Sequence, residues 1–368
     1  MTSEKPVGPA IPHPHQLEVD EFQRYDVIID ARSPREYEED HIPSALNLPV
    51  VVNDEYERVG ITHKDDPHQA YMIGVRLSLR NIADHIDQYL SGFGNEARFL
   101  VYCFRGGKRS KLWADNLRTI GFKVDVLQGG WKNYRRWVRD GLESMPPRLA
   151  FKVLSGSTGT GKTRLLAALE RAGEQVLDLE ALAAHRGSLI GGLPGVEQPS
   201  QKYFETLLLD KLRTFDPERA IWVEDESRKI GAIQIPEAMF GAIRRGDIYN
   251  IEAPMVERVR LWREDYPQLV ADPVGMVEML RPVRGLVGGE EYERWQTTAA
   301  RGATDELFER VMVQHYDPCY LRSMRKERTR DRMRATVVLD SLNDVALNAA
   351  ARSLINGDVP PTTSDECK

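Results

Sequence analysis

The sequence predicts two successive α/β domains with parallel sheets, followed by a mainly helical C-terminal part. The length of 368 residues exceeds what one hydrophobic core usually supports. Short apolar runs alternate with helical patterns, which is typical of parallel sheets covered by helices. Two glycine-rich loops, at 103–110 and 156–163, each connect an apolar run to a helical pattern.

The first domain is predicted at residues 17–142, after a proline-rich, flexible N-terminus at 1–16. Pro34 is well placed for the first turn of a short helix. Gly121 provides the stop signal of a longer one. The main predicted elements are strands at 25–32 and 98–104, a helix at 108–122, and then a strand, a tight Gly129–Gly130 turn and an amphipathic helix.

The second domain is predicted at 150–285, after a linker at 143–149. It opens with a strand, a glycine loop and a helix, the order that characterises a phosphate-binding loop. The spacing of the later strands predicts a doubly wound sheet of the P-loop NTPase type. These strands are expected at 174–180, 218–226 and 246–254, and the chain from 286 to 368 is expected to be mainly helical.

Composition limits the classes of function. The net charge of −6 does not indicate general nucleic-acid binding, although a local basic surface remains compatible with it. Cys103, Cys319 and Cys367 are too few and too widely spaced for a disulfide framework or a zinc site, so no metal ligands are assigned. No apolar run is long enough for a membrane span, and we expect a cytoplasmic protein.

Cys103 ends an apolar run directly before a predicted helix N-terminus. Basic neighbours and helix N-termini lower the pKa of a thiol, and a glycine pair lets backbone amides converge on an anion. Two chemistries fit: sulfur or selenium transfer through a persulfide-type intermediate, and phosphate-ester hydrolysis through a phosphocysteine. The candidate catalytic residues are Cys103, Arg105 and Arg109, and the candidate anion loop comprises Phe104, Gly106, Gly107 and Lys108.

The stretch "GSTGTGKT" matches the pattern G-x-x-x-x-G-K-[ST] at every position. Lys162 adds positive charge, and Thr163 is placed to hold Mg²⁺. Such a loop binds the diphosphate of any molecule, so the pattern does not by itself indicate NTP hydrolysis. The candidate diphosphate-binding residues are Gly156, Ser157, Thr158, Gly159, Thr160, Gly161, Lys162 and Thr163.

The first domain resembles the rhodanese-like family. The stretches "DARSPREYEEDHIPSALNLP", "YCFRGGKRS" and "LQGGWKNYRRW" carry this resemblance. It implies that Cys103 is a nucleophile and that Asp30 and Arg32 are framework residues near the loop. The Cys103-x5-Arg109 spacing is one residue longer than in simple rhodaneses, as in the related dual-specificity phosphatases. The longer loop predicts a pocket that admits a phosphate-sized oxyanion.

Both loops together, in this order, resemble the tRNA 2-selenouridine synthase family over nearly the whole chain. The stretches at 179–205, 223–240, 251–266 and 315–323 add to the match, whereas 58–80 follows the pattern loosely and no site is placed there. The resemblance implies that 2-thiouridine at the wobble position of tRNA is first alkylated by geranyl diphosphate. Selenium from selenophosphate, carried by Cys103 as a perselenide, then replaces the S-geranyl group. An enzyme that supplies selenophosphate is an expected partner.

Further residues are assigned to the second site. His185 and Arg186 line it by resemblance, and one of Glu224, Asp225 and Glu226 is a candidate Walker B carboxylate. Five basic residues either close over the phosphates as a lid or form a solvated helix face. They are Arg228, Lys229, Arg258, Arg260 and Arg263. The supporting residues are therefore Asp30, Arg32, Asp178, His185, Arg186, Glu224, Asp225 and Arg228.

The segment 322–335 carries seven basic residues against two acidic ones and is the candidate tRNA contact, to which 134–139 adds charge. Two other functions fit the residues: a cysteine-dependent phosphatase or sulfurtransferase fused to a nucleotide-binding domain, and a nucleotide-gated binding module without catalysis. The tRNA-binding candidates are Arg322, Arg325, Lys326 and Arg328.

Overall fold

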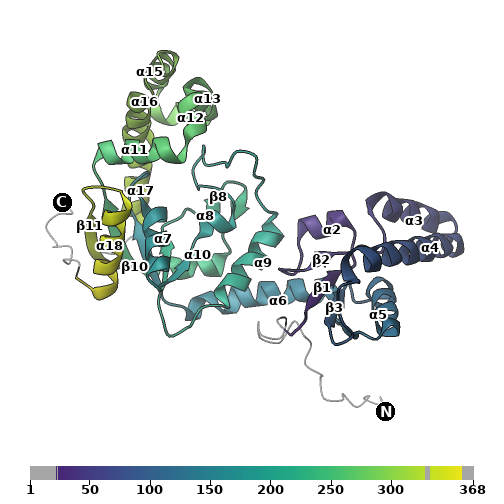
Figure 1. Cartoon of the computed structure of the whole chain (residues 1–368). Coiled ribbons are helices and arrows are strands. Elements are labelled where there is room, and N and C mark those ends of the chain that lie inside the picture. The colour runs from purple at the N-terminus through teal and green to yellow at the C-terminus, as the bar shows by residue number, and fades with distance from the viewer. Residues whose placement is uncertain (1–21, 23, 328–331, 359–368) are drawn as a thin grey trace, which may run out of the picture. The chain divides into compact units, whose positions relative to one another are not determined.

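The computed structural model describes residue 22, residues 24–327 and residues 332–358. The chain divides into two compact units. One contains the described residues up to Leu142 together with Pro199–Thr214, and the other contains Glu143–Gln198 and the described residues from Phe215 onward. Both are α/β units with a parallel sheet, as predicted (Figure 1).

The first unit is built on a four-stranded parallel sheet in the order β2-β1-β3-β4. Its central strands are apolar and buried on both faces, because helices cover both sides of a parallel sheet. The strand ends place Asp30 and Cys103 at the same edge of the sheet. The strands are β1 (Val27–Asp30), β2 (Leu46–Asn47), β3 (Arg98–Tyr102) and β4 (Lys123–Val126).

Helix α5 follows the cysteine loop and buries Trp113 and Leu117 in the sheet core. Gly121 ends it in a left-handed conformation, as its stop signal predicts. The segment in which no site was placed, 58–80, lies in a pair of packed helices, α3 and α4. The helices of this unit are α2 (Pro34–Glu39), α3 (Asn53–Asp65), α4 (Pro67–His85, continued by a π-helical turn to Leu90), α5 (Lys108–Ile120), α6 (Gly130–Ser144) and α9 (Gln201–Leu212).

The second unit contains a five-stranded parallel sheet in the order β11-β10-β5-β7-β6. Its edge strand β11 lies in the segment that was predicted to be mainly helical. Only its alternate residues Ala335 and Val337 are buried, so it lacks the continuous apolar run of a central strand. The strands are β5 (Phe151–Ser155), β6 (Gln175–Leu177), β7 (Ile221–Glu224), β10 (Asp247–Glu252) and β11 (Met333–Val338).

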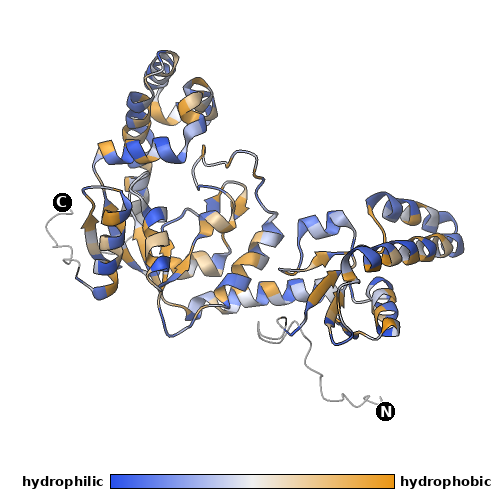
Figure 2. Cartoon of the chain, in the orientation of Figure 1, coloured by the Kyte–Doolittle hydropathy of each residue, from blue (hydrophilic) through white to orange (hydrophobic). Residues whose placement is uncertain are grey.

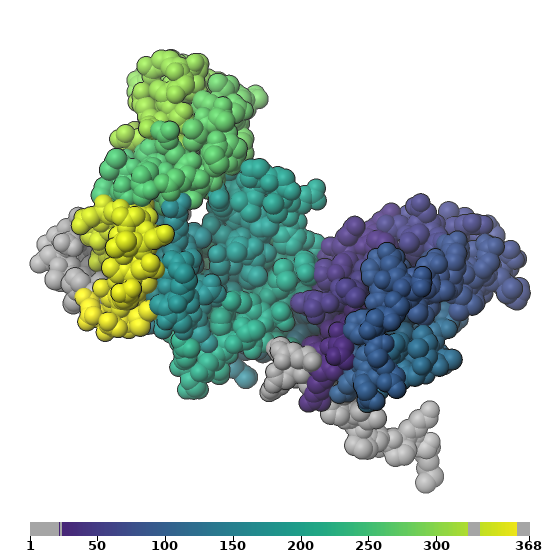
Figure 3. Space-filling view, in the orientation of Figure 1, coloured from purple at the N-terminus to yellow at the C-terminus, as the bar shows by residue number. Residues whose placement is uncertain are grey.

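Helices α7 and α18 pack side by side over this sheet (Figure 3). A separate helical group from α11 to α17 encloses its own apolar core around Trp262, Trp295 and Phe308. Figure 2 shows the apolar strands in orange and the mixed helices around them. The elements are α7 (Lys162–Arg171), α8 (Leu179–Leu182), the hairpin β8 (Lys229–Ile230) and β9 (Ile233–Gln234), α10 (Glu237–Ile243), α11 (Met255–Asp265), α12 (Pro267–Ala271), α13 (Pro273–Met279), α14 (Arg284–Val287), α15 (Gly289–Ala300), α16 (Thr304–Val311), α17 (Asp317–Glu327) and α18 (Asp344–Asn356).

The segment predicted to be a linker is ordered, since α6 continues to Ser144 and a 3₁₀ turn occupies Pro146–Arg148. None of the described helices has both the length and the apolar character that crossing a membrane requires.

Candidate active sites in the two units

The thiol of Cys103 lies at the N-terminus of α5, directly after β3. The backbone amide of Gly107 donates a hydrogen bond to its Sγ atom at 3.2 Å, and the Ser110 hydroxyl lies 3.3 Å from the same sulfur. Burial raises the pKa of the Cys103 thiol. The hydrogen bonds with Ser110 and the loop amides and the charge of Arg109 outweigh burial, so the pKa lies below its ordinary value. The geometry supports a reactive thiolate.

The three basic residues of the loop have different partners. Arg109 forms an ion pair with Glu36 on α2, with a separation of 2.6 Å, and acts on the thiol through its charge. Arg105 lies against the ring of Phe104, and Lys108 contacts Tyr71 on α4. Helix α4, which the sequence analysis left without a site, therefore contributes to the surroundings of the cysteine loop.

A second turn packs against the backbone of the cysteine loop. Gly130, which belongs to the Gly129–Gly130 turn and is the first residue of α6, has a φ of +56°. A Cβ atom there would lie 2.1 Å from the carbonyl oxygen of Cys103. The next residue, Trp131, donates its backbone amide to that same oxygen at 2.9 Å. Only glycine permits this close approach of the two backbones.

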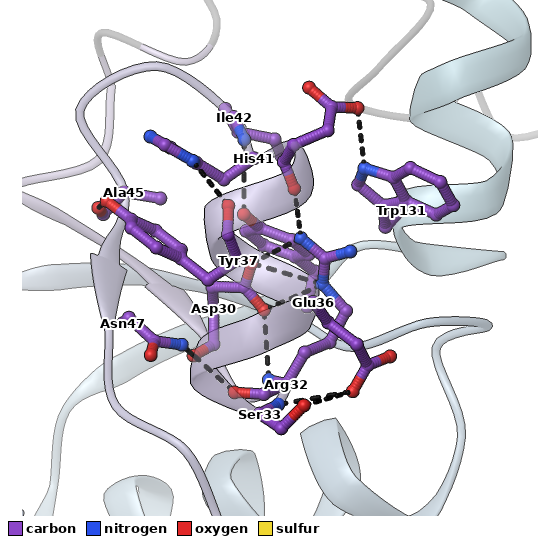
Figure 4. Close-up of polar contacts among 12 residues, drawn as sticks. Asp30, Arg32, Ser33, Glu36, Tyr37, His41, Ile42, Ala45, Asn47 and Trp131 are labelled. Carbon is purple, nitrogen blue, oxygen red and sulfur yellow. Dashed lines mark hydrogen bonds and ion pairs between the residues drawn. The ribbon is translucent and has the colours of Figure 1, made fainter. Parts of the chain in front are cut away.

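Asp30 and Arg32 form a buried ion pair (Figure 4). Arg32 donates to both carboxylate oxygens of Asp30 and to the carbonyl oxygen of Asp40. Its guanidinium group also lies over the ring of Trp131. The Asp40 carboxylate accepts from the Trp131 indole and from Thr206 on α9, each at 2.8 Å. The network thereby connects β1, α6 and α9.

We expect Arg32→Ala to destabilise the first unit by about 3–5 kcal/mol, because it leaves the Asp30 carboxylate buried without its ion-pair partner. Hydrogen exchange of β1 and β3 peptides in the full chain measures this loss. The double substitution Asp30→Ala/Arg32→Leu removes both charges and should cost less than Arg32→Ala alone. An equal or larger loss in the double variant would contradict the ion-pair explanation.

Ser110→Ala should shift the alkylation of Cys103 to higher pH, because the substitution removes a hydrogen bond that stabilises the thiolate. The measurement is the rate of iodoacetamide labelling of the Cys103 peptide between pH 5 and 9, followed by mass spectrometry. Labelling of Cys319 in the same chain is the internal control and should not respond. An unchanged Cys103 profile would show that Ser110 does not tune the thiol.

In the second unit, the phosphate loop connects β5 to α7, as predicted. The ammonium group of Lys162 donates to the carbonyl oxygens of Gly156 and Ser157, at 2.9 and 3.1 Å. Arg258 on α11 donates a hydrogen bond to the carbonyl oxygen of Thr158 in the loop, at 2.9 Å, and forms an ion pair with Asp317. The loop is therefore fixed in shape by its own lysine and by a buried arginine.

The phosphate loop opens into a cavity of about 520 Å³. Its lining includes both large apolar or aromatic side chains and acidic side chains. Four side-chain atoms of the described residues are buried without a hydrogen-bond partner, in His185, Ser188, Glu224 and Tyr316, and all four residues line this cavity. Buried polar atoms normally have partners, so this concentration indicates a ligand site. Its aromatic and aliphatic lining comprises Leu193, Leu261, Trp262, Tyr266, Tyr316 and Tyr320.

Most of the predicted second-site residues line this cavity. Asp178 caps α8, and Asp225 accepts a hydrogen bond from Ser155 at 2.7 Å. Arg186 lies over the ring of Tyr266. The loop residues Ser157 and Thr160 do not contribute to the lining. The predicted residues that do are Gly156, Thr158, Gly159, Gly161, Lys162, Thr163, Asp178, His185, Arg186, Glu224 and Asp225.

The five basic residues considered as a lid lie outside the cavity lining. Four of them pair with carboxylates. Arg228 pairs with Glu237 at 2.5 Å, and the buried Arg258 supports the loop instead of covering it. The remaining pairs are Arg260 with Glu257 and Glu264, and Arg263 with Asp305.

Of the candidate tRNA contacts, Arg322 is exposed on α17 and donates to the Pro318 carbonyl and the Cys319 sulfur. Arg328 lies outside the described residues, as do the side chains of Arg325 and Lys326. Part of the second basic stretch, 134–139, is buried inside the first unit. Arg135 is buried in α6 and forms an ion pair with Glu205 on α9.

Two glutamates of this site were not assigned individually from the sequence. Glu180 lies on α8 and was not considered, and Glu226 was only one of three alternatives. With Glu224 they form a cluster in the cavity wall. The signal available in the sequence was the position of each residue at the end of a predicted strand, since carboxyl ends of neighbouring parallel strands meet at one edge.

The fold and the two loops define a rhodanese-like domain joined to a P-loop α/β domain. The profile of the rhodanese-like domain matches residues 16–136, and that of the tRNA 2-selenouridine synthase AAA domain matches residues 149–276. A tRNA 2-selenouridine synthase of Hydrogenovibrio crunogenus is 33% identical, with 84% of this chain and 93% of that protein covered. That of Nitrosomonas europaea is 34% identical over 73% of this chain and 71% of its own length. This chain belongs to the tRNA 2-selenouridine synthase family.

Proposed function

We propose that the protein converts 2-thiouridine at the wobble position of tRNA into 2-selenouridine, with geranyl diphosphate and selenophosphate as co-substrates. The observation that carries this proposal is the cavity of the second unit, which is lined both by the phosphate loop and by aliphatic and aromatic side chains. A diphosphate attached to a hydrocarbon chain matches these two kinds of lining. The names of the relatives support tRNA and selenium as the other participants.

In the first step, the loop amides and Lys162 hold the diphosphate. The sulfur of 2-thiouridine attacks carbon 1 of the geranyl group, the carbon–oxygen bond to the diphosphate breaks, and the proton on N3 of the base is lost. The unpartnered polar groups of His185, Ser188 and Tyr316 offer hydrogen bonds to the base in the same cavity. Alkylation matters because a thiol leaves carbon 2 much more readily than a thiocarbonyl sulfur does.

In the second step, the cysteine loop receives selenophosphate. The amides at the N-terminus of α5 and the charges of Arg105, Lys108 and Arg109 favour an oxyanion beside the thiolate. The selenium of selenophosphate attacks carbon 2 of the base, from which geranylthiol leaves. The Cys103 thiolate then accepts the phosphoryl group, so that the selenium–phosphorus bond breaks and selenium stays on carbon 2. Water hydrolyses the phosphocysteine to the free thiol and phosphate. The class of reaction that must supply this substrate is the ATP-dependent phosphorylation of selenide, which makes its enzyme a partner. For tRNA, the exposed Arg322 on α17 is the described part of the proposed contact.

Nucleoside mass spectrometry tests the proposal. Purified protein is incubated with tRNA that carries 2-thiouridine, first with geranyl diphosphate and then with selenophosphate. The expected products are S-geranyl-2-thiouridine and then 2-selenouridine, while tRNA that lacks the 2-thio group stays unmodified. An unchanged 2-thiouridine after both additions would refute the proposal.

A further inference from the structure

Two stretches of the first unit carry basic charge and no acidic charge. Residues 103–114 contain four basic and no acidic residues, and residues 127–139 contain four and none as well. The fold joins the two stretches, because the backbone amides of Trp131 and Lys132 donate to the carbonyl oxygens of Cys103 and Phe104, at 2.9 and 3.0 Å. The start of α6 therefore lies against the cysteine loop, from which α5 begins.

Six of these eight basic side chains are exposed, and none of the six forms an ion pair with a described carboxylate. The other two, Arg109 and Arg135, are the ones that pair with glutamates. On α6 the exposed residues recur at intervals of four and three, which places them on one face of the helix, while its other face is buried. We call the six exposed residues the basic surface: Arg105, Lys108, Lys111, Lys132, Arg136 and Arg139.

Nearby polar groups do not neutralise the basic surface. Asp115 follows one turn after Lys111 on α5, but it pairs with Arg118. Arg136 donates to the neutral side chain of Asn133. Like charges that gather without counterions repel one another, and an anionic partner relieves this repulsion when it binds. In a chain with a net charge of −6, such a surface is a local exception that indicates an anionic partner.

The arrangement fits a chain of phosphates better than a membrane. The basic groups of α6 recur about once per turn, or about every 5.4 Å along the axis, so they can contact successive phosphates of one strand. No large apolar side chain of α6 is exposed, although binding at a lipid surface requires such side chains. The half-buried ring of Phe104 lies beside Arg105, and aromatic rings next to basic groups are typical of sites for single-stranded nucleic acid.

We propose that the basic surface binds the phosphate backbone of the tRNA anticodon arm and brings the wobble base to Cys103. The exposed face of α6 leads to the cysteine loop at Lys132, so a strand that follows this face reaches the thiol. The identity of the RNA rests on the proposed function, whereas the backbone contact rests on the charges of the surface. The contact does not depend on base sequence, because phosphates carry no base identity.

The test is fluorescence anisotropy with a labelled anticodon-arm hairpin that carries 2-thiouridine at the wobble position. The full chain is titrated without co-substrates at several salt concentrations. Lys132→Ala/Arg136→Ala/Arg139→Ala should weaken binding by at least about tenfold and lower the slope of log Kd against log salt by about two to three. Each single variant should lower the slope by about one, and these variants serve if the triple variant does not fold.

The matched control is Arg58→Ala/Lys64→Ala/Arg76→Ala, which removes three exposed charges from α3 and α4 of the same unit and should bind as the wild type. A second readout locates the RNA. Saturating hairpin should slow the labelling of Cys103 by iodoacetamide in the wild type. The same RNA concentration should leave labelling fast in the α6 triple variant, and without RNA the two proteins should be labelled at similar rates.

Three results would overturn the proposal. They are equal RNA affinity in the wild type and the α6 variants, an equal loss in the two triple variants, and labelling of Cys103 that does not respond to bound RNA. If the hairpin binds and protects Cys103 as expected, and no 2-selenouridine forms in the nucleoside assay, the RNA surface stands and the proposed function fails.

Discussion

Cys103→Ser is expected to reduce selenium incorporation by about a thousandfold or more, since a serine hydroxyl stays protonated at neutral pH and cannot replace the thiolate. Geranyl transfer should continue, because the phosphate loop is unchanged. S-Geranyl-2-thiouridine should therefore accumulate, and mass spectrometry of the tRNA nucleosides measures it. The serine is nearly isosteric in the loop, where Gly107 and Ser110 contact the sulfur.

Cys319→Ser is the matched control, because Cys319 is a free cysteine on α17 of the second unit. That variant should form 2-selenouridine as the wild type does. Two results would contradict the assignment of Cys103. One is selenium transfer that persists in Cys103→Ser, and the other is a simultaneous loss of geranyl transfer, which would require both loops to act in a single step.

Lys162→Ala is expected to slow geranyl transfer by about 10²–10³-fold, because the departing diphosphate loses a charged donor. The ammonium group also bonds two carbonyl oxygens of its own loop, so the loop loses part of its fixed shape. Unreacted 2-thiouridine should remain in the nucleoside digest. Arg352→Ala removes an exposed charge from α18 and should leave the rate unchanged.

A second substrate separates the two steps in this variant. When Lys162→Ala receives tRNA that already carries S-geranyl-2-thiouridine, 2-selenouridine should form at the wild-type rate. The cysteine loop lies in the other unit and keeps all its contacts. Failure of this rescue would show that Lys162 serves the selenium step as well, and the assignment of one step to each loop would be wrong.

The local sequence was sufficient to predict the positions of the central strands and of the two loops. In β1 and β3 nearly every residue is apolar and buried, so the pattern is strong without any knowledge of neighbours. The edge strand β11 buries only alternate residues, and its short pattern did not stand out from the surrounding helical segments. The helices α3 and α4 expose much of their surface, and α3 buries no residue, which weakens their periodicity.

The sequence by itself determined the class of fold and the positions of the cysteine loop and the phosphate loop, because each of these depends on residues close together in the chain. Tertiary structure alone decided the partners of these residues. Arg109 meets Glu36, Asp40 meets Thr206, and three glutamates from two neighbouring strand ends meet at one cavity. Arg109 and Glu36, Asp40 and Thr206, and Glu180 and Glu224 are each separated by dozens of residues or more, and only the strand order of the sheets and the packing of the helices bring these side chains together.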